Sequence, residues 1–79
     1  MKVGEIVEYK GIGTIQMVLD EDGRKCYNYT HYFFGQTSTE DTIKGAREML
    51  DYDQEQAGKI RLAINVLTCR GYKVYKEIA

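Results

Sequence analysis

Five of the nine residues from Cys26 to Phe34 are aromatic, and this run closely follows an Asp22-Gly23 dipeptide. Aromatic and β-branched residues favour strands, and Asp-Gly between two such segments is a strong signal for a β-hairpin. The run therefore predicts a strand of a small sheet, paired with the segment before it. The core or a binding surface is expected here.

The hairpin loop determines which side chains share a face of this sheet. A three-residue loop, Glu21-Asp22-Gly23, sets Met17 opposite Tyr27 and Ile15 opposite Tyr29, with Gly23 in a left-handed conformation. A two-residue loop would shift the register by one and mix apolar with polar residues. The three-residue loop is preferred because it leaves one apolar and one polar face. The polar face then carries Thr14, Gln16, Val18, Cys26, Asn28 and Thr30.

The remaining elements follow from periodicity and from capping residues. Residues 4–9 and 14–19 are the first two expected strands, the aromatic run is the third, and residues 72–78 alternate as a last strand. Ser38 or Thr39 is expected to cap a first helix that ends near Leu50 to Tyr52, before a second helix. The predicted fold is a single α+β domain over residues 1–79, of order β-β-β-α-α-β. Three N-terminal strands plus a C-terminal strand form a small, mostly antiparallel sheet packed on two helices.

The second predicted helix is apolar on two sides. One stripe comprises Ile60, Ala63, Ile64 and Leu67, and the other comprises Leu62, Val66 and Cys69. A helix with two apolar sides needs two partners, of which the sheet is one. Leu62, Val66 and Cys69 are therefore the predicted interface, and a homo-oligomer is expected because a chain this short has little core of its own.

Charge and composition restrict the function classes. The net charge is −1, from 11 basic and 12 acidic residues, so a general DNA binder with a clear basic excess is disfavoured. No apolar run approaches the roughly 18–20 residues of a membrane helix, and no apolar signal region begins the sequence. Two cysteines are too few for a disulfide scaffold. A cytoplasmic protein that does not engage membranes is expected.

No catalytic or metal motif stands out. His31 is the only histidine, and a strand residue is the simpler interpretation of it than an acid–base group or a partner of Cys26 or Cys69. The Asp51-Asp53-Glu55 spacing resembles the start of a calcium loop, but Gln56 stands where that loop needs glycine. We therefore expect no enzyme activity, no metal and no cofactor.

Candidate binding residues are the cationic and aromatic side chains that could surround a ligand. Lys44 and Arg47 share a helix face, and Arg24 and Lys25 lie at the hairpin end, so the four could frame a pocket for a phosphate group. Tyr32 and Phe34 are aromatic side chains that could stack on a ligand.

The function predicted from these features is a small binding module with a protein partner. One hypothesis is a phage or mobile-element accessory protein that inhibits a host protein by direct binding. Two alternatives are an oligomeric binder that sequesters a small nucleotide-like anion, and, less favoured, a reader of single-stranded nucleic acid. Seven tyrosines support an interface-rich protein, because tyrosine combines an apolar ring with a polar hydroxyl.

Overall fold

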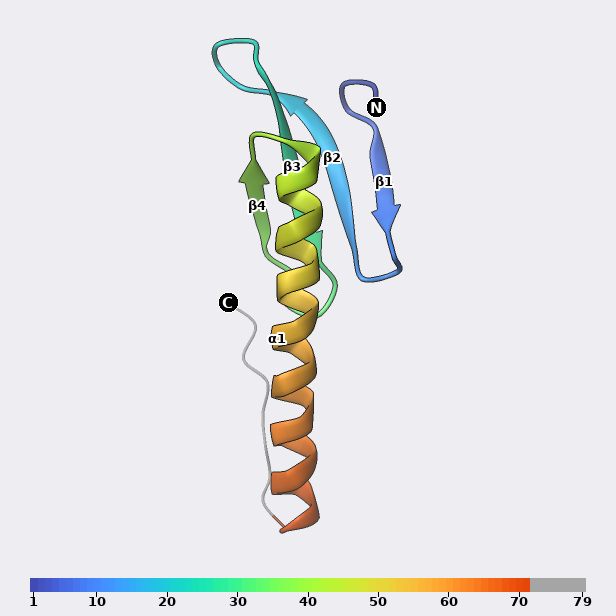
Figure 1. The fold of residues 1–79 in the computed structure, drawn as a ribbon, viewed down its shortest axis with the longest axis vertical. Helices are drawn as coiled ribbons and strands as arrows, with labels where there is room; N and C mark the ends of the chain where they lie inside the picture. The colour runs from blue at the N-terminus through green and yellow to red at the C-terminus, as the bar shows by residue number, and fades with distance from the viewer. Residues whose placement is uncertain (72–79) are drawn as a thin grey trace.

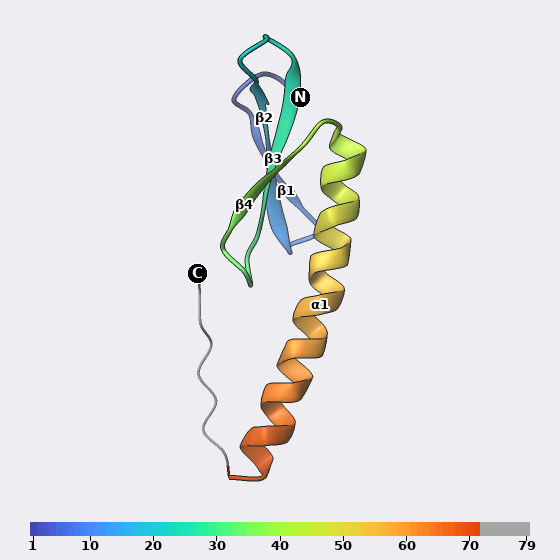
Figure 2. The ribbon, with the colours of Figure 1, turned by 90° about the vertical axis from the view of Figure 1, so that its left-hand side faces the viewer.

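The computed structural model describes residues 1–71, which form a four-stranded sheet and one long helix (Figure 1). The elements in chain order are β1 (Ile6–Tyr9), β2 (Gly13–Leu19), β3 (Lys25–His31), β4 (Thr37–Glu40) and α1 (Ile43–Cys69). The sheet is an antiparallel meander of order β1-β2-β3-β4. Seen from the side, α1 packs against one face of it, and no other described element covers the opposite face (Figure 2). The α+β class is confirmed.

The predicted β2–β3 hairpin is confirmed in register and in loop. Met17 pairs with Tyr27 and Ile15 with Tyr29. Gly23 takes a φ of 80°, and its N–H donates to the Asp20 carbonyl at 3.0 Å. The Asp20 carboxylate accepts backbone hydrogen bonds from residues 22 and 24 at 2.9 and 2.8 Å. The acidic loop therefore contains an Asx turn at Asp20, and this turn fixes the register of the β2–β3 pair.

The fourth strand of the sheet differs from the prediction. Residues 37–40 form β4 beside β3, whereas the predicted C-terminal strand, residues 72–78, lies outside the described residues. Hydroxyl contacts hold the new strand in place. The Thr30 and Thr37 hydroxyls lie 2.7 Å apart, and the Thr39 hydroxyl donates to the Asn28 side-chain carbonyl at 2.7 Å. Such cross-strand pairs stabilise a short edge strand that has no apolar alternation.

The prediction of two helices, the first capped by Ser38 or Thr39, is wrong. One uninterrupted helix of 27 residues begins after Thr42, whose hydroxyl accepts from the Gly45 N–H at 3.0 Å. Ser38 and Thr39 belong to β4 instead. The acidic segment around Asp51 was expected to break the helix, yet it contains neither proline nor glycine, and the carboxylates of Asp51 and Glu55 make contacts compatible with a helix. Gly71, with a φ of 87°, follows the Arg70 C-cap of the helix, the position that glycine favours.

The core lies between the upper half of α1 and one face of the sheet. Its buried members are Ile15, Tyr29, Ala46 and Leu50, and Val7, Tyr9, Ile12, Tyr27, Ile43 and Met49 pack around them. His31 is 2 % exposed and belongs to the same layer. Its Nδ1 accepts from the Phe33 N–H at 3.1 Å, and its Nε2 lies 2.9 Å from the Gln54 amide oxygen. Both ring nitrogens thus have partners, as a structural histidine requires.

A polar clamp ties the β1–β2 turn to the helix. The Asp51 carboxylate accepts a hydrogen bond from the Tyr9 hydroxyl at 2.9 Å and pairs with the Lys10 ammonium at 3.2 Å. The Tyr9 hydrogen bond is the largest cause that lowers the pKa of Asp51 from its ordinary value of 3.8; burial opposes it, and the hydrogen bond and charge of Lys10 lower the pKa further. The contact joins residues 42 positions apart and lies at the place where a helix break was expected.

The clamp predicts an acid-dependent loss of stability. Because the pKa of Asp51 is lower in the folded than in the unfolded state, its contribution is present above the unfolded pKa and disappears as pH falls through the folded pKa. The parent should therefore exceed Asp51→Asn in free energy of unfolding at about pH 6, and the difference should shrink towards about pH 3. Urea titrations measure it, with Glu21→Gln in the hairpin loop as the control. A difference independent of pH would contradict the role of the charge.

Candidate functional site

The lower half of α1 extends beyond the sheet. Ala57 is the last buried residue of the helix, and the residues after it up to Cys69 are exposed except for the half-buried Ile64. The radius of gyration is 15.5 Å, against about 12 Å for a compact chain of this length. A helix of 27 residues is about 40 Å long, whereas a seven-residue strand spans about 23 Å. The length of the helix therefore requires that part of it lacks cover from the sheet.

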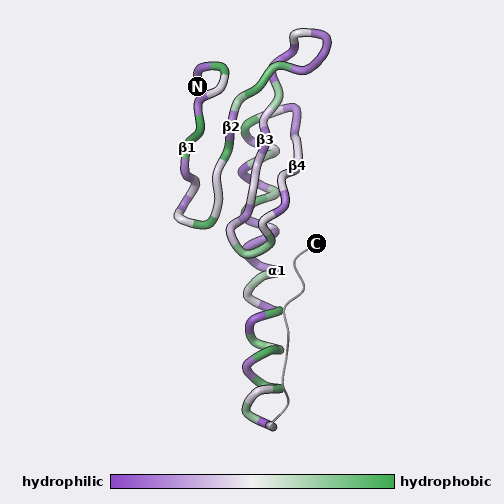
Figure 3. The backbone as a smooth tube through the Cα atoms, turned by 180° about the vertical axis from the view of Figure 1, so that it is seen from behind, coloured by the Kyte–Doolittle hydropathy of each residue, from purple (hydrophilic) through white to green (hydrophobic). Residues whose placement is uncertain are grey.

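We call residues 58–70 the helix tip. Apolar and polar residues alternate along it in the hydropathy view (Figure 3). Its large aliphatic side chains remain open to water, with exposed fractions of 40 % for Ile60, 65 % for Leu62, 44 % for Val66 and 40 % for Leu67. The predicted interface residues Leu62, Val66 and Cys69 are thus all exposed here.

One apolar stripe of the tip continues the core stripe of the helix. Ile43, Ala46, Leu50, Asp53, Ala57, Ile60, Ile64 and Leu67 follow one another at alternating steps of three and four residues. This is the spacing of a helix seam that faces a partner along its whole length. The sheet covers the first part of the seam and leaves Ile60 and Leu67 exposed, whereas Ile64 between them is half-buried.

The charge of the tip differs from that of the rest of the chain. Lys59, Arg61 and Arg70 are its charged residues, and it contains no acid, so the remainder carries the whole acidic excess. Lys59 lies 3.8 Å from Glu55, a solvent-exposed pair of one helical turn. The Arg61 guanidinium lies over the Phe33 ring at 5.0 Å from its centroid. The tip is therefore a basic helix with apolar residues on two sides.

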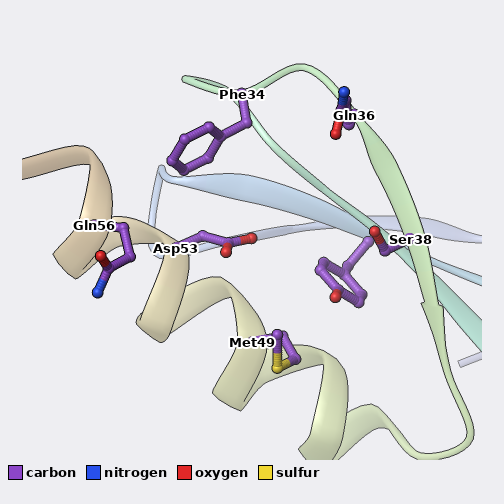
Figure 4. A pocket seen from close by; sticks show the side chains of 7 residues that line it. Phe34, Gln36, Ser38, Met49, Asp53 and Gln56 are labelled. Atoms are coloured by element: carbon purple, nitrogen blue, oxygen red, sulfur yellow. The ribbon is translucent and has the colours of Figure 1, made fainter. Parts of the chain in front are cut away.

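A pocket of about 310 Å³ lies between α1 and the β3–β4 connection (Figure 4). It is lined by Tyr29, Phe34, Gln36, Ser38, Met49, Asp53 and Gln56. Asp53 points from the helix into the space below the Phe34 ring. The Phe34 ring packs against the rings of His31, at 5.5 Å between centroids, and Phe33, at 5.1 Å. The aromatic wall is therefore held in place by its own neighbours.

The predicted basic residues are placed apart from this pocket. Arg24 and Lys25 are exposed at the end of the β2–β3 hairpin, and Lys44 and Arg47 are exposed near the start of α1. Lys44 lies 4.0 Å from Glu48. None of the four lines the pocket, and a phosphate site framed by them stays a prediction.

Of the two predicted aromatic residues, only Phe34 lines the pocket, whereas Tyr32 is 54 % exposed on the connecting turn. The aromatic run leaves the sheet at His31, and Gly35 closes the turn with its N–H bonded to the His31 carbonyl at 2.8 Å. The structure therefore divides the run between strand, turn and pocket wall.

Sequence reasoning missed Asp53 as a pocket residue, although a signal was present. Asp53 is the one charged residue in the seam between Leu50 and Ala57, a position where a globular helix places an apolar side chain. Ending the first predicted helix near Leu50 to Tyr52 hid this anomaly. No group of three or more histidine, cysteine or acidic side chains in residues 1–71 could hold a metal ion. Cys26 is buried on the sheet face opposite His31, and Cys69 is at the end of α1.

Within the described part of the chain, no helix combines the length and apolar character needed to cross a bilayer. Comparisons of the sequence and the structure with protein-family models, curated proteins and solved structures found no match.

Proposed function

We propose that this protein is a non-enzymatic binding module that inserts its helix tip into an apolar groove with an acidic rim on a partner protein. One observation carries the proposal: the tip leaves four large aliphatic side chains 40–65 % exposed on a rigid helix. Contiguous exposed apolar surface rimmed by polar residues marks interaction sites. Helix-in-groove recognition uses side chains at these helical spacings.

The magnitudes indicate what the partner must supply. Complete burial of an exposed aliphatic side chain is worth about 1.5–3 kcal/mol, so a half-exposed one gains on the order of 1 kcal/mol. Four such residues therefore offset only the lower end of the cost of association, which is about 4–15 kcal/mol. The basic side chains of the tip must contribute as well, and they do so only opposite acidic groups. An acidic rim follows from this comparison.

Charge also favours a different protein over a second copy of this chain. Two tips packed side by side would bring Lys59, Arg61 and Arg70 of both copies together, and like charges at an interface cost energy. An anionic membrane surface fits less well. A helix that lies on a membrane has one apolar face and one broad polar face, whereas the tip is apolar on two sides. A groove that encloses the helix matches two apolar sides.

Nucleotide sequestration gains no support from the pocket, because Asp53, the charged residue that lines it among residues 1–71, is acidic. The identity of the partner as a host protein, inhibited by a phage or mobile-element protein, stays a prediction.

Photo-crosslinking tests the proposal. With p-benzoylphenylalanine in place of Val66, we expect light to join the protein to one partner in a lysate of its source. The purified partner should then bind the parent in a salt-sensitive manner. Leu62→Glu should weaken that binding at least about tenfold, because it places a buried carboxylate in an acidic groove. Ile6→Glu is the matched control, since Ile6 is 62 % exposed on β1, far from the tip, and should bind as the parent does.

Each contrary outcome identifies a different occupant. An adduct of twice the 9.1 kDa chain mass would replace the proposal with a homodimer. Co-sedimentation with phosphatidylglycerol vesicles, lost in Leu62→Glu, would replace it with membrane binding. The proposal would be rejected if the tip crosslinked to no protein and bound no vesicle. It would also be rejected if Leu62→Glu bound the partner as tightly as the parent does.

A further inference from the structure

The pocket between α1 and the β3–β4 connection is lined by several polar side chains. Its polar lining consists of the Tyr29 hydroxyl and the side chains of Gln36, Ser38, Asp53 and Gln56. None of these groups makes a side-chain hydrogen bond or an ion pair with another residue among 1–71. Structural polar groups near a core are usually satisfied by one another, as those of His31 and Gln54 are. Gln36 and Ser38 are exposed to water, whereas Asp53 and Gln56 are half-buried beside the buried Tyr29, so the Asp53 carboxylate is the group that a ligand would complete.

The charge of the pocket selects a cation. Asp53 is half-buried, and no lysine or arginine among residues 1–71 lines the cavity. By contrast, Asp51, two residues earlier on the same helix, is paired with Lys10 and Tyr9. The Asp53 carboxylate therefore has no side-chain partner among residues 1–71, and it is half-buried, where an opposite charge is worth more than in open water.

The walls of the pocket suit an ammonium group on an alkyl chain. The Phe34 ring and the Tyr29 ring provide aromatic surface, which attracts cations, and the Met49 thioether provides apolar surface. Side-chain oxygens of Gln36, Ser38 and Gln56 are acceptors available to an N–H donor. A cavity of about 310 Å³ is at the lower end of the range for small-molecule sites, which limits the ligand to a few carbons.

We propose that this pocket binds a protonated primary amine on a short alkyl chain, with the Asp53 carboxylate as its counter-ion and Phe34 and Tyr29 as its aromatic walls. The amine could belong to a free polyamine or to a lysine side chain of a polypeptide. Both carry the same ammonium group, which is the group that the site binds. The site is separate from the helix tip, so this inference does not depend on the proposed function.

A titration with n-butylammonium, followed by amide NMR of the whole chain, tests the site. We expect saturable shifts at Phe34, Gln36, Met49 and Asp53. Asp53→Asn should weaken binding at least about tenfold, because it removes the charge from a hydrogen bond of this kind. Phe34→Leu keeps an apolar wall but removes the aromatic face, and it should weaken binding about two- to fivefold. Circular dichroism should show that both variants remain folded.

The matched control is Glu55→Gln, which removes the same charge from the same helix at a side chain 68 % exposed and outside the pocket. It should bind n-butylammonium as the parent does. n-Butanol, the neutral analogue, should bind much more weakly. Equal affinity for n-butanol, or an unchanged affinity for n-butylammonium in Asp53→Asn, would overturn the proposal by showing an unspecific apolar or acidic surface.

Two further probes distinguish the sources of the amine. Spermidine represents a free polyamine, and Nα-acetyl-lysine methylamide represents a lysine side chain of a polypeptide. Either probe should displace n-butylammonium from the parent. It should do so equally well from Leu62→Glu, because Leu62 does not line the pocket. The probe that binds more tightly identifies the source of the amine. Failure of both probes to displace n-butylammonium would contradict an alkylammonium site.

Discussion

Gly13→Ala is expected to lower the free energy of unfolding by about 3 kcal/mol, at the upper end of the cost of overpacking. A β-carbon at Gly13 would overlap the backbone carbonyl oxygen of Thr30 and would lie 2.8 Å from Leu50 Cδ2 and 3.2 Å from His31 Cα. Two of these atoms are backbone of β3, which is paired on both sides within the sheet and so cannot move alone. Glycine is required here because the helix side chain must approach the strand closely. Urea denaturation measures the loss.

Gly58→Ala is the control for this substitution. A β-carbon at Gly58 meets no atom within 4 Å, and the residue lies inside α1. Alanine is the better helix former by about 0.8–1.0 kcal/mol, so this variant should be more stable than the parent. Opposite signs for the same chemical change would show that packing at Gly13, and not backbone freedom, decides the result. A Gly13→Ala protein as stable as the parent would contradict the contact between β2, β3 and Leu50.

The close packing at Gly13 also shows which parts of this fold local sequence can predict. The β2–β3 hairpin was predicted in detail because its signals are adjacent: Asp22-Gly23 sets the loop, and period-two alternation on both sides sets the register. By contrast, the approach of Leu50 to Gly13 joins residues far apart in the chain. Gly13 was interpreted only as part of the turn between the first two strands. The local sequence does not show which distant side chain packs against a glycine.

β4 and the continuous helix were missed for related reasons. Thr37–Glu40 is short and polar, and the hydroxyl pairs that hold it involve side chains of β3. Ser and Thr before an acidic pair also resemble a helix cap, and local sequence does not separate the two outcomes. In the helix, an end was predicted near Leu50 to Tyr52, because the partners of Asp51, Tyr9 and Lys10, lie some 40 residues earlier and are not visible in the local sequence.

The candidate sites divide in the same way. Leu62, Val66 and Cys69 could be selected from periodicity because an uncovered helical stripe is a local pattern, and the structure leaves them exposed. The pocket depends on Asp53 and Phe34 meeting across the space between a turn and a helix, which only tertiary structure reveals. Charge alone pointed to Arg24, Lys25, Lys44 and Arg47, none of which reaches that pocket.

Leu50→Ala is expected to cost about 2–5 kcal/mol, the range for truncating a buried leucine. The Leu50 side chain is 0 % exposed and packs with Ile15, Tyr29 and Ala46 at the centre of the core. A domain of this size has roughly 4–12 kcal/mol of stability, so a large part of it should disappear. Leu62→Ala is the matched control, because it makes the same change on the same helix at a side chain 65 % exposed. It should stay within about 0.5 kcal/mol of the parent.

A double-mutant cycle between positions 13 and 50 then tests whether the two sites share one contact. Leu50→Val suits the cycle because valine lacks both δ carbons yet removes less of the core than alanine does, which keeps the double variant measurable. Without Cδ2, the alanine at position 13 loses one of its two worst overlaps and keeps the one with the Thr30 carbonyl. The combined cost should therefore be less than the sum of the single costs by about 0.5–3 kcal/mol, and rescue should be incomplete. Strict additivity would mean that Leu50 does not pack onto Gly13, and complete rescue would mean that the Thr30 carbonyl yields.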